Sequence, residues 1–333
     1  MKQTTVAATT HLDSHFSSFT KEALEQAAAQ INRGGRPAVT VEHDPTLPPL
    51  GKQTRAWVEQ REDGEYQLVV EHEIFDDVSW AEFSNGVRLF KQESATDRNP
   101  FVDRYERAAD DTFLYFDPVN FDSKEALRSF IEDIKGDSGE EFAAQPFARK
   151  SALPDPEFLI GIAKVVAAYL ITRSVLNKVG DKLINLAAED VAKFYSFVRA
   201  AVISAAKYSR PKGRPVTYVF VARGNPTLEF IARSADPDVV ISAVKLERLE
   251  GALADADFFH RTLGAVKIQY LLDAAGGWKF NYLLTDSGAV IGTEESISRR
   301  ARVLELLTQH HVSLNESDPE QGATTSGREL TED

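Results

Sequence analysis

Hydrophobic and polar positions alternate in the first third of the chain, as they do in half-buried strands. Residues 37–43, 52–60 and 66–75 are rich in Val, Tyr and Phe, and the turn-forming sequence REDGE separates the last two as a hairpin requires. A short helix is expected before them at 16–32, with Thr20 as its N-cap. The pattern therefore predicts a region rich in β-structure.

The next segment changes from aromatic to helical and then to irregular. The aromatic run 113–121 is expected to pack on the sheet, and a helix is expected from Ser123 to Ile134, with the serine as its cap. Residues 136–156 combine Gly, Ser, Pro and charged residues, a composition typical of a linker.

The middle of the chain has helical periodicity. Residues 157–208 contain no proline, and apolar residues recur there close to helical spacing. A break at VGD, residues 179–181, predicts two packed helices. After residue 214 the pattern predicts the order ββαβββα, with a last helix at 294–309, which indicates an antiparallel sheet covered on one face.

Together these patterns predict an α+β protein with two domains. The first is a β-rich N-terminal domain, and the second packs two long helices on an antiparallel sheet. The polar and acidic C-terminal segment is expected to be a disordered tail. The expected boundaries are 1–135 for the first domain, 136–156 for the linker, 157–309 for the second domain and 310–333 for the tail.

Composition narrows the functional classes. The chain has no cysteine, which excludes disulfides, thiolate nucleophiles and cysteine-ligated metal sites. A net charge of −13 argues against nucleic-acid binding, although residues 151–214 are basic, with 10 Lys and Arg against 5 Asp and Glu. The first residues have no apolar signal-peptide core, so we expect a cytoplasmic protein.

Sequence motifs of large enzyme classes are missing. The chain contains no GxxxxGK[ST], GxGxxG, HExxH or GxSxG. His310 and His311 have no carboxylate close by in the sequence, and alternation along a strand places His72 on the face opposite Glu71 and Glu73. We therefore expect neither a metal site nor a cofactor.

One loop and the strands after it have the sequence VEHDPTLPPLGKQTRAWVE, which is followed by the turn REDGE. The residues concerned are His43, Asp44, Pro45, Pro49, Gly51, Lys52, Asp63 and Gly64. Residues 41–75 resemble the beginning of the prohead proteases of tailed phages, in which a His-Asp-Pro loop leads into such a turn and hairpin. The resemblance implies a histidine base and a serine on a later strand, here His43 with Ser84, or with Ser79 in its place.

The same loop has a structural interpretation. Asp44 can hydrogen-bond to nearby backbone, and the three prolines of the loop fix φ. The family's serine strand is built from small residues and ends in glycine and an aromatic residue, a pattern that neither Ser79 nor Ser84 matches. We favour the structural interpretation and therefore expect no catalysis.

The basic middle of the chain is a candidate for membrane contact. The apolar stretch 158–171 is shorter than the roughly 20 residues that span a bilayer. Lys178 and Lys182 would suit a helix that lies on anionic lipid. A core helix is the alternative, and we favour it.

The last predicted sheet is a candidate for ligand binding. Strict alternation places Trp278, Phe280 and Tyr282 on one face of a strand. Such an aromatic row packs under a helix or contacts a ligand. Trp278 is the candidate binding residue of this row.

The sequence alone does not identify a function. We favour a recognition or assembly protein that is not an enzyme and has a protein partner, and the resemblance points to a phage or mobile-element context. Two alternatives stay open: a serine protease of the prohead type, and an effector that contacts membranes through its basic helical middle.

Overall fold

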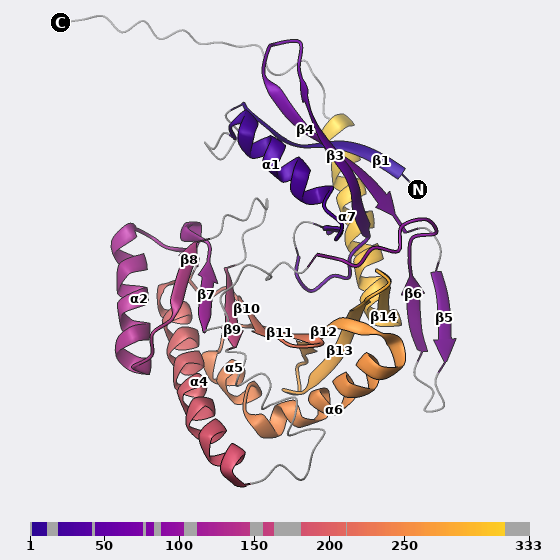
Figure 1. Ribbon diagram of the computed structural model, residues 1–333. Helices are drawn as coiled ribbons and strands as arrows, with labels where there is room; N and C mark the ends of the chain where they lie inside the picture. Colours follow the sequence, from indigo (N-terminus) through magenta and orange to yellow (C-terminus); the bar gives the residue numbers. More distant parts are fainter. Residues whose placement is uncertain are drawn as a thin grey trace, which may run out of the picture.

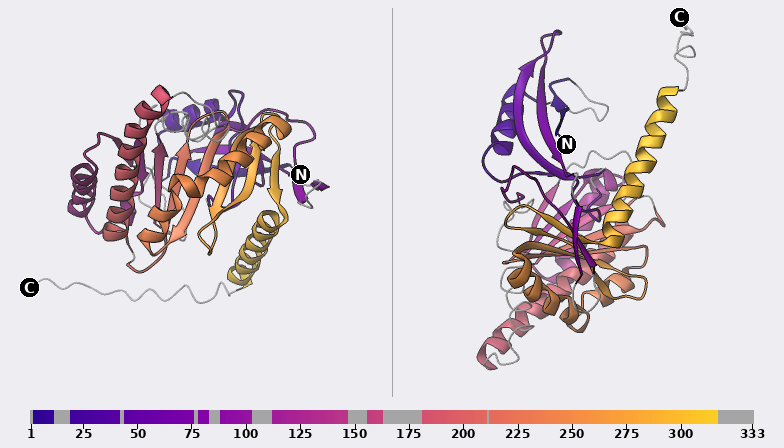
Figure 2. Two further views of the ribbon diagram at one scale, coloured as in Figure 1. Left: turned by 90° about the horizontal axis from the view of Figure 1, so that it is seen from below. Right: turned by 90° about the vertical axis from the view of Figure 1, so that its right-hand side faces the viewer.

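The computed structural model shows an α+β protein that contains a four-stranded and a ten-stranded sheet (Figure 1). The helices that cover the larger sheet lie on the side away from the smaller sheet (Figure 2). The structure describes residues 2–11, 19–41, 44–75, 78–82, 88–102, 112–146, 156–162, 181–210 and 212–316.

The four-stranded sheet is antiparallel and carries helix α1 (Lys21–Ile31) on one face. The Thr20 hydroxyl accepts a hydrogen bond from the Ala23 N–H at 3.2 Å and begins this helix, as the sequence predicts. Leu24 of α1 packs in one apolar cluster with Val70 of the sheet. The strands, in their order across the sheet, are β1 (Lys2–Thr9), β4 (Tyr66–Ile74), β3 (Gly51–Gln60) and β2 (Ala38–Val39).

The ten-stranded sheet is mixed, which corrects the prediction of an antiparallel sheet. The β9–β10, β11–β12 and β7–β8 pairs are parallel. Helices between β11 and β12 return the chain to the same end of the sheet, so the second strand runs parallel to the first. The strand order is β5 (Val78–Glu82), β6 (Arg88–Gln92), β14 (Val290–Thr293), β13 (Trp278–Thr285), β12 (Ala265–Leu272), β11 (Thr227–Ser234), β10 (Val216–Ala222), β9 (Glu157–Ile162), β7 (Phe113–Phe116) and β8 (Ala143–Pro146).

One large apolar cluster lies between this sheet and its helices. It includes Phe130 of α2, Val202 of α4 and Leu253 of α6, each at most 3% exposed. The 3-10 helix η1 (Pro118–Asn120) follows β7, and α7 projects from β14 on the side of the smaller sheet (Figure 2). Among the described residues, the α-helices besides α1 are α2 (Lys124–Ser138), α4 (Asp181–Tyr208), α5 (Pro237–Ala243), α6 (Leu246–Leu263) and α7 (Glu294–Glu316).

Of the pair of helices predicted at 157–208, the second is confirmed as α4, and the first is wrong at residues 157–162. Residues 157–162 form the buried strand β9 between β7 and β10, whereas α4 is the long helix. A short run of apolar residues fits a fully buried strand as well as a helix, and pairing on both sides makes it a strand here. Phe158 and Ile160 are at most 1% exposed, so they are not available to lipid. Residues 163–180 lie outside the described residues.

The predicted linker and tail also need correction. Helix α2 continues to Ser138 and strand β8 pairs with β7, so residues 136–138 and 143–146 belong to regular structure. Strands from both sides of 136–156 belong to the ten-stranded sheet, so the sheet does not separate at this boundary. Helix α7 extends to Glu316, past the predicted helix end, and 317–333 lie outside the described residues. The division into two domains stays a prediction.

Candidate functional site

The sequence of residues 44–49, which we call the tethered loop, restricts their backbone conformation. Asp44 Oδ1 accepts hydrogen bonds from the Thr46 N–H at 2.8 Å and from the Thr46 hydroxyl at 2.7 Å. Pro45, Pro48 and Pro49 fix φ along the rest of the loop. The contact predicted for Asp44 with nearby backbone is therefore present.

Side chains of the ten-stranded sheet and α7 hold the loop by its carbonyl groups. Gln269 Nε2 donates to the Pro45 carbonyl at 2.9 Å. Asn281 Nδ2 and Arg299 Nη2 donate to the Thr46 carbonyl at 2.8 and 2.6 Å. These contacts join parts of the chain more than two hundred residues apart, which places the loop firmly on the sheet.

Arg300 completes the attachment at the end of the loop. Its Nη1 donates to the carbonyls of Pro48 and Pro49, and its Nη2 donates to the Gln92 side chain. Arg300 is 5% exposed, and this burial lowers its pKa to about 10. The guanidinium therefore stays charged at neutral pH, and its charge strengthens the hydrogen bonds that it donates.

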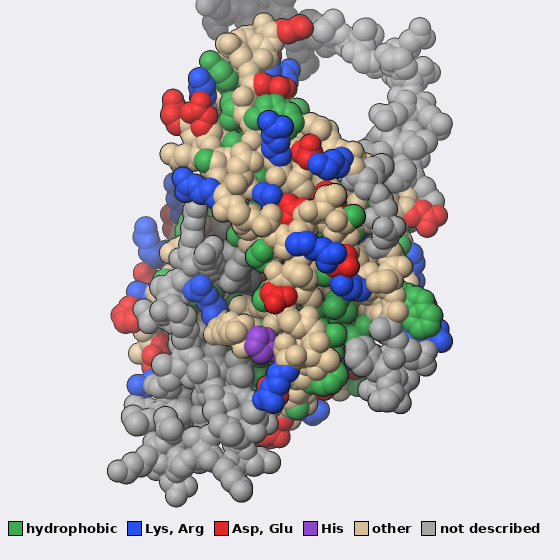
Figure 3. All heavy atoms as spheres, turned by 45° about the vertical axis from the view of Figure 1, so that its right-hand side comes forward, with side chains coloured by type: hydrophobic (Ala, Val, Ile, Leu, Met, Phe, Trp, Pro, Cys, Tyr) green, Lys and Arg blue, Asp and Glu red, His purple; other side chains and the backbone are tan. Residues whose placement is uncertain are grey.

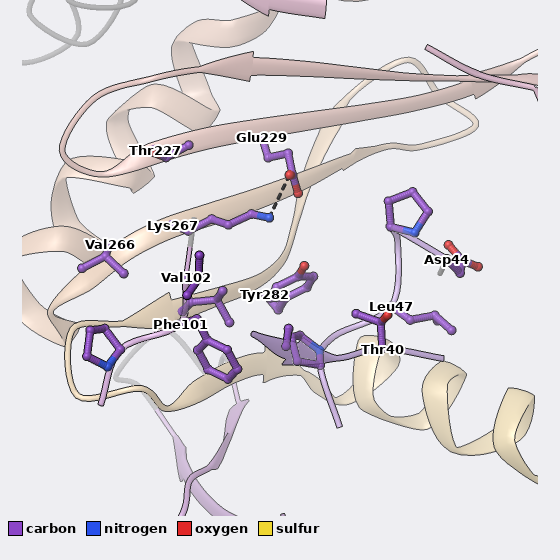
Figure 4. A pocket seen from close by; sticks show the side chains of 15 residues that line it. Thr40, Asp44, Leu47, Phe101, Val102, Thr227, Glu229, Val266, Lys267 and Tyr282 are labelled. Atoms are coloured by element: carbon purple, nitrogen blue, oxygen red, sulfur yellow. Dashed lines mark ion pairs between the residues drawn. The ribbon is translucent and has the colours of Figure 1, made fainter. Parts of the chain in front are cut away.

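A pocket of about 210 Å³ opens between the tethered loop, residues 100–102 and strands β11 to β13 (Figure 4). Most of its lining is apolar. The apolar lining residues are Ala38, Pro45, Leu47, Pro49, Pro100, Phe101, Val102, Val266 and Leu284. The polar lining residues are Thr40, Asp44, Thr227, Glu229, Lys267 and Tyr282.

An ion pair forms the polar corner of the pocket. Lys267 Nζ lies 2.8 Å from Glu229 Oε1 on the neighbouring strand, and Figure 4 shows the two side chains pointing toward each other. Glu229 Oε2 accepts a hydrogen bond from Gln269, whose Nε2 also lies 3.2 Å from the Tyr282 hydroxyl. Gln269 thereby links the polar corner to the tethered loop.

A buried lysine supports the opposite wall. Lys52 Nζ donates to the carbonyls of Asp97 and Asn99 at 2.9 and 2.7 Å and lies 5.3 Å from the centre of the Phe101 ring. Burial lowers the pKa of Lys52, while the negative charge of Asp97 partly opposes that shift. Arg36 Nε lies 2.6 Å from Asp97 Oδ2 and fixes the same segment. In this structure Lys52 therefore holds the segment that forms one pocket wall.

A second hollow of about 370 Å³ lies beside the four-stranded sheet and is lined in part by His72. His72 Nε2 lies 2.6 Å from the Thr5 hydroxyl, whereas Nδ1 is buried and has no hydrogen-bond partner among the described residues. Burial lowers the pKa of His72. The imidazole is therefore harder to protonate in the folded protein than in the unfolded chain.

This shift predicts a pH dependence of stability. The contribution of neutral His72 to the free energy of unfolding is fully present above its unfolded-state pKa of roughly 6.5. This contribution is lost as the pH falls through the lower pKa of folded His72. The free energy of unfolding should therefore decrease less steeply from pH 7.5 to pH 5.5 in His72→Gln than in the parent. Urea unfolding at both pH values measures this difference, and equal slopes would show that His72 does not contribute.

The sequence-predicted site residues are not brought together by the described structure. His43, Ser84 and Lys178 lie outside the described residues. Lys182 belongs to α4, but its side chain also lies outside the described part. Trp278 donates a hydrogen bond from Nε1 to the carbonyl of Ala243, the last residue of α5, at 2.9 Å.

A β-bulge changes the predicted aromatic row. Gln269 pairs with Tyr282, but the next residue of β12, Tyr270, pairs with Phe280. The extra residue in β13 reverses the alternation, because a bulge adds one residue to one strand. Trp278 and Phe280 pack against the cluster beneath the helices, whereas Tyr282 lines the pocket. Tyr282 is thus a pocket residue that strict alternation places on the wrong face.

No protein-family model, curated protein or solved structure matches the chain. The resemblance to prohead proteases and the expectation of a protein partner therefore stay predictions. Within the described residues, no group of three or more His, Asp and Glu side chains could hold a metal ion. None of the helices in the described ranges is both long and apolar enough to cross a membrane.

Proposed function

We propose that the protein is a recognition protein without catalytic activity, and that it binds a small ligand in the pocket under the tethered loop. The observation that supports this proposal is a concave, mostly apolar pocket that holds the Lys267–Glu229 ion pair in one corner. Ligand sites in proteins usually have this composition and are largely formed before the ligand binds.

The hydrogen bonds that hold the two pocket walls in place favour a site that is formed before the ligand binds. Gln269 and Asn281 hold the loop wall, and Lys52 holds the wall that contains Phe101. Lys52 and Gln269 are fully buried. Because these contacts already fix the walls, a ligand would lose little free energy to ordering them.

The contacts of the loop also favour recognition over the protease alternative. That alternative depends on His43 and Ser84, which lie outside the described residues. The sheet and α7 hold the adjoining residues by main-chain carbonyls, as a structural loop requires. We therefore retain the structural interpretation of the loop within this proposal.

The charge distribution on one face of the protein argues against nucleic-acid binding. On the face shown in Figure 3, Lys and Arg side chains are interspersed with Asp and Glu among the coloured residues. Binding to a nucleic-acid backbone favours cations that cluster on one face. The expectation that the protein does not bind nucleic acid therefore remains part of the proposal.

Filling the pocket is expected to abolish ligand binding. Val266→Trp places a large side chain in the apolar lining, so fragments that bind the parent should bind at least roughly tenfold more weakly. Ligand-observed NMR titrations measure this change, and the same spectra should show each compound unchanged after prolonged incubation.

Val239→Trp is the matched control, because Val239 is 42% exposed on α5 and does not line the pocket. Its affinities should equal those of the parent. Fragments that bind both tryptophan variants as they bind the parent would place recognition elsewhere. Conversion of bound compounds, lost in His43→Ala and Ser84→Ala, would instead support the protease.

A further inference from the structure

We propose that the pocket selects a small carboxylate with an apolar body, and that its anionic group contacts the ammonium of Lys267. This inference rests on the proposed function and specifies the ligand class of the same site. The observation behind it is the unequal exposure of the two charged side chains in the polar corner.

Lys267 is the more accessible of the two charged side chains in the polar corner. The side chain of Lys267 is 17% exposed and that of Glu229 is 2% exposed. Both Glu229 carboxylate oxygens also have donors, Lys267 at Oε1 and Gln269 at Oε2. A ligand group that reaches the corner therefore meets a cation, which favours an anionic acceptor.

The rest of the lining defines the body of the ligand. Leu47 comes from the tethered loop, Phe101 from the opposite wall, and Val266 and Leu284 from the sheet. These side chains offer no charged group to a ligand, and burial of apolar ligand surface against them is favourable. The combination fits an aromatic or branched carboxylate better than an inorganic anion or a sugar.

Asp44 is the other carboxylate in the lining and would oppose an anion. Its Oδ1 is directed to Thr46, and Figure 4 shows its carboxylate pointing away from the Lys267–Glu229 pair. Arg299 interacts electrostatically with Asp44. The negative charge of Asp44 is thus partly balanced by Arg299 and directed away from the corner where the ligand group would lie.

Three probes have similar shapes and sizes but different charges, so they test the effect of ligand charge alone. They are phenylacetate, phenylacetamide and phenethylamine. Methyl NMR of Leu47, Val266 and Leu284 should report binding of phenylacetate at least about tenfold tighter than of phenylacetamide at pH 7. Phenethylamine should bind most weakly. Added salt should weaken the binding of phenylacetate and leave that of phenylacetamide nearly unchanged.

Two lysine variants test the contact itself. Lys267→Met should reduce the affinity for phenylacetate to that for phenylacetamide, and Lys267→Arg should largely preserve the preference. Lys279→Met is the control, because Lys279 is 70% exposed and pairs with Asp273 outside the pocket. The salt test on the parent protein remains decisive if Lys267→Met does not fold.

The outcomes separate this inference from the proposed function. Equal or tighter binding of phenylacetamide or phenethylamine at the pocket methyl groups would overturn the anion preference and leave the pocket as a ligand site. If no probe shifts these methyl groups at millimolar concentration, the carboxylate inference is wrong. The fragment comparison of Val266→Trp with Val239→Trp then decides the proposed function independently.

Discussion

Gly288→Ala is expected to lower the free energy of unfolding by about 2–4 kcal/mol, because it combines backbone strain with overpacking. Gly288 has a φ of 72°, in the left-handed region that favours glycine. A Cβ at this position would overlap the Asn99 carbonyl oxygen and Lys52 Nζ. The substitution would therefore push apart the lysine and the carbonyl that together hold the pocket wall.

Gly64→Ala separates these two effects. Gly64 also has a positive φ, 89°, but a Cβ there would meet nothing within 4 Å. Its expected cost is backbone strain alone, about 1–2 kcal/mol. Urea unfolding of both variants measures the difference in the free energy of unfolding. Equal losses would mean that Lys52 and the Asn99 carbonyl can move away from the added Cβ without a cost in free energy.

Arg300→Ala is expected to lower the free energy of unfolding by about 3–5 kcal/mol. The substitution leaves the carbonyls of Pro48 and Pro49 without their buried donor and opens a cavity beside Gln92. It should also weaken ligand binding in the pocket, because the tethered loop forms one of its walls. Urea unfolding and fragment titration measure the two effects.

Arg302→Ala provides the comparison for Arg300. Arg302 belongs to the same helix but is exposed, so its removal should change stability by no more than about 0.5 kcal/mol. A similar small effect of Arg300→Ala would show that the buried arginine does not hold the loop.

Local sequence signals predict the elements that they directly encode. The Thr20 and Ser123 caps begin α1 and α2, and the REDGE turn joins β3 to β4. The sequence also predicts the order of elements after residue 214, except that the single helix expected between β11 and β12 is two helices, α5 and α6. Sequence periodicity therefore gives the α+β class and most of the helices.

Non-local pairing is what the sequence does not reveal. Strand β6 joins β14, and β9 lies between β7 and β10, although nothing in these short strands specifies their partners. Partner choice depends on the packing of the whole sheet. For the same reason, the apolar run at 157–162 reads as a helix until its neighbours are known.

Local sequence patterns likewise predict only part of the candidate site. The tethered loop is visible from its prolines and Asp44, but its partners Gln269, Asn281 and Arg299 are ordinary polar residues in distant elements. Their function follows from burial, which a single sequence does not display. The bulge that turns Tyr282 toward the pocket likewise has no glycine or proline to mark it.

Crystals of the protein soaked with fragments that bind in solution would show directly whether the pocket under the tethered loop is the recognition site. We expect ligand density between the tethered loop and β11 to β13, with any carboxylate within hydrogen-bond distance of Lys267 Nζ and little displacement of the loop. Density only at other surfaces, with this pocket closed or filled by solvent, would contradict the proposal that the pocket is the recognition site.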